Sequence, residues 1–188
     1  MKLAQTITLI AATVTAGITA GTMAAFAYSV IPGLQRNGDD RTFVDTMNQM
    51  NKAILNGWFM LCFMGALLFI IAAGLLQLHR HERPVLYWLI AAFVLYSAAL
   101  LITSGVNVPL NNQMLHDADH HVASVAVIRD HFEAKWVQWN VIRTVVHAAA
   151  VVALAGALVA HGRVHSGVST ASQDATPSYQ APTPAAYR

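Results

Sequence analysis

Four long stretches of the chain contain no Asp, Glu, Lys or Arg, and they run from Leu3 to Gln35, from Ala53 to His79, from Pro84 to His116 and from Thr144 to Gly162. A helix needs about 20 predominantly apolar residues to cross the hydrocarbon core of a bilayer. The first three stretches reach that length, and the fourth reaches it if Arg143 lies at an interface. The pattern therefore predicts four membrane-crossing helices.

Turn signals between these stretches set the expected bounds of the helices. We expect them over residues 3–30, 55–78, 84–106 and 136–160. Pro32 followed by Gly33 is typical of a turn and predicts the end of the first helix. Pro84 suits the first turn of the third helix. The segment 79–83 is so short that the second and third helices must be antiparallel neighbours.

A cleaved signal peptide is the alternative interpretation of the first stretch, because Ala25-Phe26-Ala27 resembles a cleavage site. The apolar run is, however, longer than the apolar region of a typical signal peptide. Gly17, Gly21 and Ala25 also form a stripe of small residues, and such stripes let membrane helices approach closely. These features favour an uncleaved helix.

Composition supports an all-α membrane protein. The chain has 188 residues, of which 56% are hydrophobic and 11% charged, whereas soluble domains carry about 25% charged residues. This excludes a soluble enzyme, a nucleic-acid binder, a disulfide scaffold and a disordered protein. We expect a polytopic four-helix bundle over residues 1–161 with an extracytoplasmic loop layer. Residues 162–188 are rich in Ser, Thr, Pro and Ala and predict a disordered tail.

The orientation follows from the positive residues near the membrane ends. The two sides carry five Lys and Arg residues each, but Arg80 and Arg83 crowd one short turn while the opposing five spread over two long loops. This density predicts that both termini are cytoplasmic. The bacterial cytoplasmic membrane is the expected location.

A polar face on the fourth predicted helix is the clearest functional signal. Asn140, Arg143 and His147 are spaced by three and four residues, so they share one helical face, which Trp136 extends. Ionisable groups inside a bilayer are costly and mark functional sites by default. The plainer alternative is that Arg143 reaches the interface and His147 is a hydrogen-bonded core residue. The three together favour a polar pocket inside the bundle.

Two further segments add polar groups to this end of the bundle. Asn107 and Asn111 flank Pro109, which should stop the third helix from continuing normally; simple capping explains one of these asparagines but not both. In the first loop, Phe43, Met47 and Asn51 have the spacing of an amphipathic helix over the bundle mouth. Ordinary loop packing also explains that segment and is the interpretation that we prefer for it alone.

The second loop contains a histidine cluster. His116 and His120 are four residues apart, a spacing that lets two imidazoles bind one metal ion on a helix. Asp117 and Asp119 lie nearby. A metal site normally needs a third ligand and supporting groups, which the sequence does not identify. We therefore expect a solvated loop, and keep a metal site at His116 and His120 as the alternative.

Four motifs resemble the anthrone oxygenase-like family of four-helix membrane proteins. They are Tyr28-x-x-x-Pro32-Gly33-Leu34, Phe43-Val44-x-x-Met47-x-x-x-Asn51, Asn107-Val108-Pro109-Leu110-Asn111 and Trp136-x-x-Trp139-Asn140-x-x-Arg143-Thr144. The resemblance covers about residues 10 to 160. Neither the 116–121 stretch nor His147 has a counterpart in the pattern. Characterised fungal relatives convert an anthrone to an anthraquinone with molecular oxygen and without a conventional cofactor.

The resemblance implies a site that holds a small apolar aromatic substrate and O2. Such a site needs an apolar slot, a base and donors for the developing oxyanion. We expect His147 to be the base, because burial favours the neutral imidazole, and Arg143 to stabilise the anion. The expected substrate-binding residues are Asn51, Asn107, Asn111, Trp136, Trp139 and Asn140.

Two other functions stay open at this point. One is a non-catalytic membrane protein that binds a small molecule or a lipid in the same pocket, and the other is the metal-binding protein named above. The sequence contains no glycine-rich phosphate loop, no dinucleotide fingerprint and no repeated half of the kind that transporters use. A bundle of four short helices could also function as a homo-oligomer.

Overall fold

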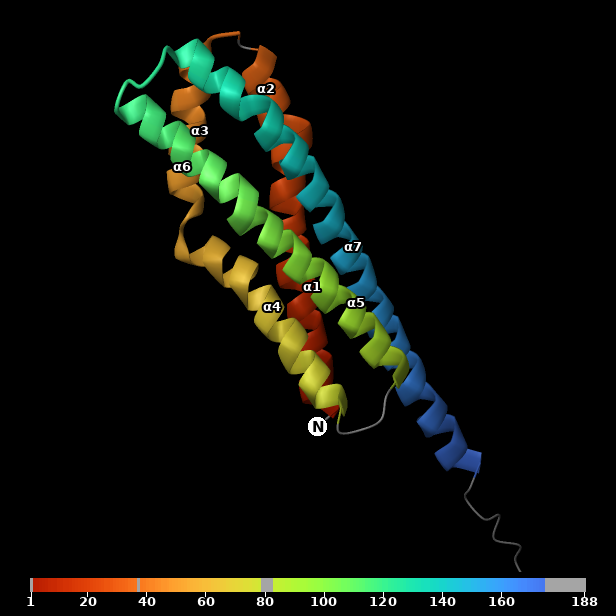
Figure 1. Ribbon diagram of the computed structural model, residues 1–188. Coiled ribbons are helices and arrows are strands. Elements are labelled where there is room, and N and C mark those ends of the chain that lie inside the picture. The colour runs from red at the N-terminus through yellow and green to blue at the C-terminus, as the bar shows by residue number, and fades with distance from the viewer. Residues whose placement is uncertain (1, 37, 79–82, 175–188) are drawn as a thin grey trace, which may run out of the picture.

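The computed structural model describes residues 2–36, 38–78 and 83–174, with the backbone alone for 166–174. This part of the chain is 94% helical and contains no strands. Four of its helical segments are long and apolar enough to cross a membrane, and they form one elongated bundle (Figure 1). The expected fold class, a membrane four-helix bundle, is confirmed.

The helical elements follow one another with short connections. In chain order they are α1 (Lys2–Ala25), the π-helical turn η1 (Phe26–Val30), α2 (Ile31–Arg36), α3 (Asp40–Ile54), α4 (Gly57–Leu78), α5 (Arg83–Ile102), the π-helical turn η2 (Thr103–Asn107), α6 (Val108–Asp119) and α7 (Val125–Asp174). The first span thus joins α1, η1 and α2, and the third span joins α5, η2 and α6. The second and fourth spans are α4 and α7.

The first span does not end at Pro32, which corrects the sequence prediction. It continues to Arg36, and the π-helical turn η1 immediately precedes the proline. The N–H of Ile31 donates to the carbonyl of Phe26, five residues back. A proline ring in a regular α-helix clashes with the carbonyl four residues before it. The wider turn moves the carbonyls out of that register, so the helix can continue past Pro32.

The third span repeats this solution at Pro109, which we expected to stop the helix. The π-helical turn η2 precedes Pro109, and the N–H of Val108 donates to the carbonyl of Thr103. The helix therefore runs on as α6 to Asp119 in place of ending near residue 106. Two of the four spans consequently share a proline preceded by a widened turn at the same end of the bundle.

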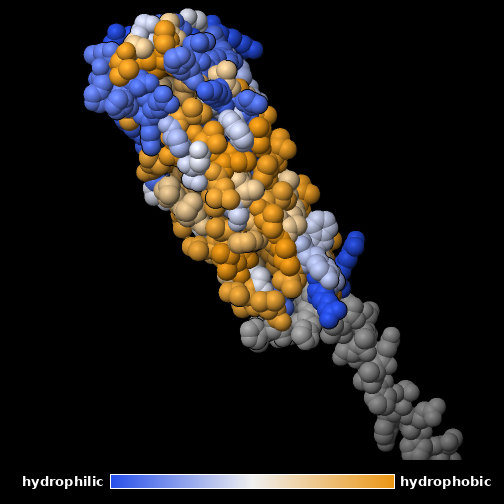
Figure 2. Space-filling model, in the orientation of Figure 1, coloured by the Kyte–Doolittle hydropathy of each residue, from blue (hydrophilic) through white to orange (hydrophobic). Residues whose placement is uncertain are grey.

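Alanine dominates the buried seam between the spans. The main core contains Leu9, Ala12, Ala16, Ala66, Ile70, Ala73, Val85, Leu89, Ala92, Tyr96, Ala150, Ala153, Leu154 and Ala157. Small residues let membrane helices approach closely, and here Ala12 and Ala16 do this on α1. The expected stripe makes no close helix contact at Gly17 or Gly21 within the described chain, because apart from the local helix backbone no atom lies within 4 Å of a Cβ built at either position. Large apolar side chains face outward instead (Figure 2).

A hydrophilic surface covers one end of the bundle (Figure 2). We call this end the polar cap; it comprises α2, α3, α6 and residues 125–135 of α7. Asp39 begins α3 as its N-cap, accepting hydrogen bonds from the backbone N–H groups of Arg41 and Thr42 and from the Thr42 hydroxyl. These bonds, led by the Thr42 hydroxyl, lower the pKa of the Asp39 carboxyl.

The polar cap has its own apolar core and a half-buried ion network. Phe43 and Met47 of α3 are buried against Phe132 of α7. The segment is thus an amphipathic helix, and not the ordinary loop that we preferred from the sequence. Arg129 lies between two carboxylates, at 2.9 Å from Asp40 and 2.6 Å from Glu133. This network fixes α3 on α7 and so holds the polar cap in place over the end of the bundle.

The fourth span is longer than predicted at both ends. It begins at Val125 and continues to Asp174, where the sequence predicted a disordered tail from residue 162. The segment 162–174 contains no proline, and the first proline beyond the span is Pro177, so nothing in the sequence prevents the helix from continuing. The expected tail from 175 to 188 lies outside the described residues.

Candidate functional site

Arg143 of α7 is buried inside the bundle, with only 6% of its surface exposed. Its Nε and Nη2 groups donate to Oδ1 of Asn140 at 3.1 and 2.9 Å, and its Nη1 group donates to the hydroxyl of Thr103 at 3.4 Å. The guanidinium carbon lies 5.4 Å from the centre of the Trp136 ring. Within the described residues, no carboxylate forms an ion pair with Arg143. A buried cation held only by neutral groups is costly and is suited to bind an anion.

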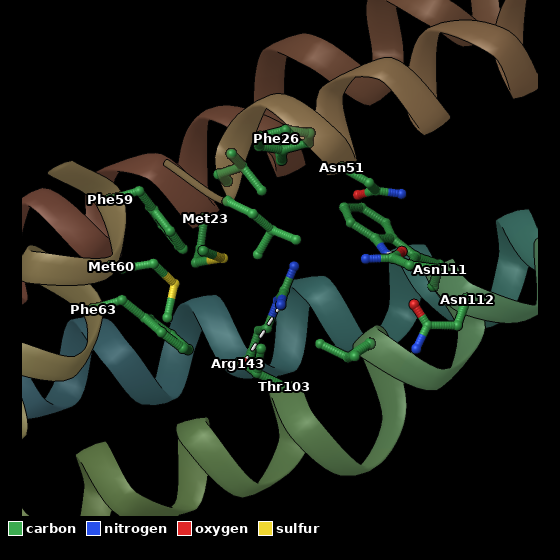
Figure 3. Close-up of a pocket in the computed structure, with 14 residues that line it drawn as sticks. Met23, Phe26, Asn51, Phe59, Met60, Phe63, Thr103, Asn111, Asn112 and Arg143 are labelled. Carbon is green, nitrogen blue, oxygen red and sulfur yellow. Dashed lines mark hydrogen bonds between the residues drawn. The ribbon is translucent and has the colours of Figure 1, made fainter. Parts of the chain in front are cut away.

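The Arg143 guanidinium faces a cavity with a volume of about 240 Å³. Figure 3 shows this side chain directed to the middle of the cavity, with aromatic and methionine side chains on one flank and asparagines on the other. The lining residues are Met23, Phe26, Asn51, Ile54, Leu55, Phe59, Met60, Phe63, Thr103, Val108, Asn111, Asn112, Trp136 and Arg143. Arg143 is the one ionisable side chain in this lining. The cavity is thus apolar, with one cation and a few amides and a hydroxyl.

Aromatic rings from three spans form much of the wall. Phe59 and Phe63 of α4 stack with ring centroids 5.3 Å apart and an interplanar angle of 16°. Phe26, the first residue of η1, lies 6.0 Å from Trp136 of α7. Flat walls of this kind suit a planar aromatic ligand. Neither the phenylalanines nor Met23 was predicted, although the four-residue spacing of Phe59 and Phe63 puts them on one helical face.

Two asparagines present amide groups to the cavity. The Trp136 indole N–H donates to Oδ1 of Asn111 at 2.7 Å, which fixes the amide of Asn111. Asn51 has a buried Nδ2 group with no hydrogen-bond partner in the described structure. Buried polar groups are nearly always hydrogen-bonded, so this N–H group is available to a ligand. The predicted roles of Asn51, Asn111 and Trp136 are therefore consistent with their positions in the cavity wall.

Three predicted residues do not line the cavity themselves. Asn140 is buried and orients Arg143, while its own Nδ2 donates to the carbonyl of Met23 at 3.3 Å. Asn107 is fully buried and donates to the carbonyl of Trp136 at 3.4 Å. Trp139 is half-buried and does not line the cavity. Of these, Asn140 supports the cavity most directly, because its oxygen holds the guanidinium.

His147 is also buried but lies outside the cavity lining, behind Phe63. Its ring centroid is 6.4 Å from that of Phe63 and 5.0 Å from that of Tyr96. Both ring nitrogens are buried without a hydrogen-bond partner among the described residues. Tyr96, which the sequence did not single out, donates to the carbonyl of Phe63 at 2.8 Å. His147 thus shares a face with Arg143 but does not line the cavity, although its ring lies close to that of the cavity-lining Phe63.

His116 and His120 lie at the C-terminal end of α6, beyond the cavity-lining residues Asn111 and Asn112 of the same helix, and do not line the cavity. The His116 and His120 rings stack with centroids 4.3 Å apart, and Nδ1 of His116 lies 3.3 Å from Oδ1 of Asp117. In the part of the chain that the structure describes, no three His, Cys, Asp or Glu side chains come together as a metal site. The described structure therefore adds no support to the alternative of a metal site at His116 and His120.

A family model described as anthrone oxygenase matches residues 59–153, half of the chain. The matched segment begins at Phe59 in α4 and includes Thr103, Asn111, Trp136 and Arg143 of the cavity wall. The wall residues from α1, η1 and α3 precede the match. No curated protein and no solved structure matches the chain.

Proposed function

Because the chain belongs to the anthrone oxygenase family, we propose that it is a membrane-embedded oxygenase that uses O2 to oxidise an anthrone or a related hydroxylated aromatic, without a bound cofactor. Family membership supports oxygenase-like chemistry. One observation carries the substrate class: a buried guanidinium without a carboxylate partner faces an aromatic-lined cavity. A planar molecule that becomes an anion on its way to product fits that combination.

The proposed chemistry needs only the substrate and dioxygen. The central CH2 of an anthrone loses a proton, and the resulting anion carries its charge on the oxygen of the former carbonyl group. This anion passes one electron to O2, and the substrate radical and superoxide combine to form a C–O bond. The peroxide then takes up the proton and loses water, which leaves the quinone carbonyl. One O2 is consumed and one water is released per substrate.

Arg143 is the proposed anion-stabilising residue. A preorganised donor aimed at developing charge in a water-poor site is a large contribution to catalysis. The free Nδ2 group of Asn51 supplies a second donor, and the stacked Phe59 and Phe63 rings supply a flat apolar wall. Asn140 holds the guanidinium in position from behind.

His147 is the proposed base, with one condition. Its ring lies behind Phe63, so the Phe63 side chain must rotate before an imidazole nitrogen can accept the substrate proton. The two unpartnered ring nitrogens support this role. A histidine that served only in packing would lower the stability of the fold, because two buried polar atoms would lack hydrogen bonds.

Oxygen uptake by the purified protein in lipid vesicles tests the proposal. We expect a hydroxylated anthrone to be converted to its anthraquinone with an equal molar uptake of O2, above the rate in vesicles without protein. A non-catalytic binding protein would shift the thermal unfolding of the chain on addition of the anthrone and consume no oxygen beyond the background. That result would refute the oxygenase proposal.

We also propose that both termini face the cytoplasm and that the polar cap faces the opposite side. The crowding of Arg80 and Arg83 in one short turn supports this orientation. Single cysteines placed at Asp45 of the cap and at Lys2, in a Cys62→Ala background, would test it. Only the Asp45 cysteine should react with a membrane-impermeant thiol reagent added outside intact cells.

A further inference from the structure

The exposed part of the cavity wall is confined to one place. Leu55 is 71% exposed, Val108 42% and Met60 37%, and Asn112 is also exposed. The opposite wall, including Met23, Phe63, Trp136 and Arg143, is buried. We call the four exposed residues the rim. They come from the junction of α3 with α4 and from the start of α6.

The packing of the helices explains why the cavity opens there. α4 packs on α1 and α5, whereas α6 packs on α3 and α7. The first turns of α4 and the first turns of α6 therefore diverge around the rim. Above the cavity, α3 packs on both α6 and α7, so the polar cap covers the side that faces water.

We place the rim at the depth of a membrane interface, on the evidence of an exposed tryptophan beside it. Trp58, at the start of α4, is 69% exposed, and tryptophan is enriched where the headgroups meet the hydrocarbon. Leu55 and Met60 flank it in sequence. Three of the four rim residues are apolar, so the opening faces lipid more than water.

From this arrangement we propose that the cavity loads sideways from the bilayer, and that its ligand is a hydroxylated aromatic already dissolved in the interfacial region of the leaflet. The assignment of this ligand class rests on the proposed function. The ligand passes between Met60 and Val108 with its rings in lipid, and its acidic hydroxyl or carbonyl reaches Arg143 last. Dioxygen, which is more soluble in hydrocarbon than in water, follows the same route.

Lateral loading makes a specific prediction about concentration. If the ligand comes from the bilayer, its occupancy follows the mole fraction of ligand in the lipid, whatever the volume of water. A dihydroxyanthraquinone is a suitable probe, because O2 does not oxidise it further and its absorption quenches tryptophan fluorescence. When the amount of phosphatidylcholine is varied at fixed protein, half-saturation should always occur at the same mole fraction of probe in the lipid.

Rim variants with matched controls test the route itself. Met60→Phe with Val108→Phe narrows the opening, and Met64→Phe with Val94→Phe makes the same substitutions at lipid-exposed positions away from the cavity. In stopped-flow mixing with probe-loaded vesicles, the rim pair should associate about tenfold more slowly than wild type. Dissociation should slow as well, because the probe leaves through the same opening. The control pair should match wild type.

Three outcomes would overturn the lateral route. They are half-saturation that follows the aqueous probe concentration, equal association rates for the rim and control pairs, and the absence of saturable quenching. Oxygen uptake is measured separately with an anthrone. A protein that loads the probe from lipid but consumes no oxygen would therefore refute the oxygenase proposal and leave the route intact.

Discussion

A single oxygen atom of Asn140 holds Arg143, accepting hydrogen bonds from Nε at 3.1 Å and from Nη2 at 2.9 Å. The other end of the same amide donates to the carbonyl of Met23 on α1 at 3.3 Å. The amide is thereby fixed with its oxygen toward the guanidinium. This neutral support leaves the positive charge uncompensated, so the charge is available to a ligand.

Asn140→Asp should weaken the binding of anionic ligands. The new carboxylate would pair with Arg143 and supply the counter-ion that the ligand supplies in the native protein. We expect the ionised dihydroxyanthraquinone to bind about tenfold more weakly, because an adjacent opposite charge offsets the attraction of the site. Tryptophan quenching in vesicles measures this. Asn140→Ser, which keeps a neutral acceptor, is the control, and unchanged binding by Asn140→Asp would contradict the ligand-anion account.

The hydrogen bond between Trp136 and Asn111 should stabilise the cavity wall. Trp136→Phe keeps an aromatic ring but removes the N–H donor, and Asn111→Leu removes the acceptor. Each change should lower the free energy of unfolding by about 1 kcal/mol, with the two effects less than additive because they remove one shared bond. A double-mutant cycle by thermal unfolding in detergent checks this. Fully additive effects would show that the bond contributes nothing.

His147→Phe should separate catalysis from binding. A general base contributes about 100-fold or more to turnover, so kcat for an anthrone should fall by at least that factor. The Kd of the non-oxidisable probe should stay near the native value, because His147 does not line the cavity. Tyr96→Phe, which keeps the ring beside His147, is the matched control and should retain turnover. Native kcat in His147→Phe would make this histidine a packing residue.

The N-cap of α3 predicts a pH effect at the acidic end. The folded pKa of Asp39 lies below its ordinary value of 3.8, so its ionised form is bound more favourably in the folded state. Its stabilising contribution is present above that ordinary pKa and is lost as pH falls through the lower, folded value. The difference in melting temperature between wild type and Asp39→Asn should therefore shrink on acidification. A constant difference from neutral to strongly acidic pH would contradict this.

The spans could be predicted from sequence because the rule behind them is local. A helix that crosses the hydrocarbon core contains few charged side chains, because each one is costly there, and the charge-free stretches record this directly. The ends could not be predicted in the same way. Pro32 and Pro109 would each end an ordinary helix, but a widened turn before each proline lets the helix continue. Composition contains no clear signal for such a turn.

The sequence predicted Asn51, Asn111 and the cavity residues of α7, but not the rest of the wall. The periodicity of α7 correctly brought Asn140 and Arg143 to the same buried face. That periodicity cannot predict which residues of other helices lie opposite the face. Here Phe63 of α4 lines the cavity, while His147, whose ring lies 6.4 Å from that of Phe63, does not. The phenylalanine wall and the hydroxyl of Thr103 come from other spans, so tertiary packing alone brings them to Arg143.

The most direct test of the account is the oxygen-uptake rate of Arg143→Leu and Arg143→Lys with a hydroxylated anthrone in lipid vesicles. Leucine fills similar space without a charge, and lysine restores a positive charge without the planar fork of donors. Removing one preorganised oxyanion donor costs about 100- to 1000-fold in turnover. We therefore predict that Arg143→Leu loses turnover to that extent and that Arg143→Lys recovers part of it. Native turnover in Arg143→Leu would contradict the central claim that this buried cation stabilises the substrate anion.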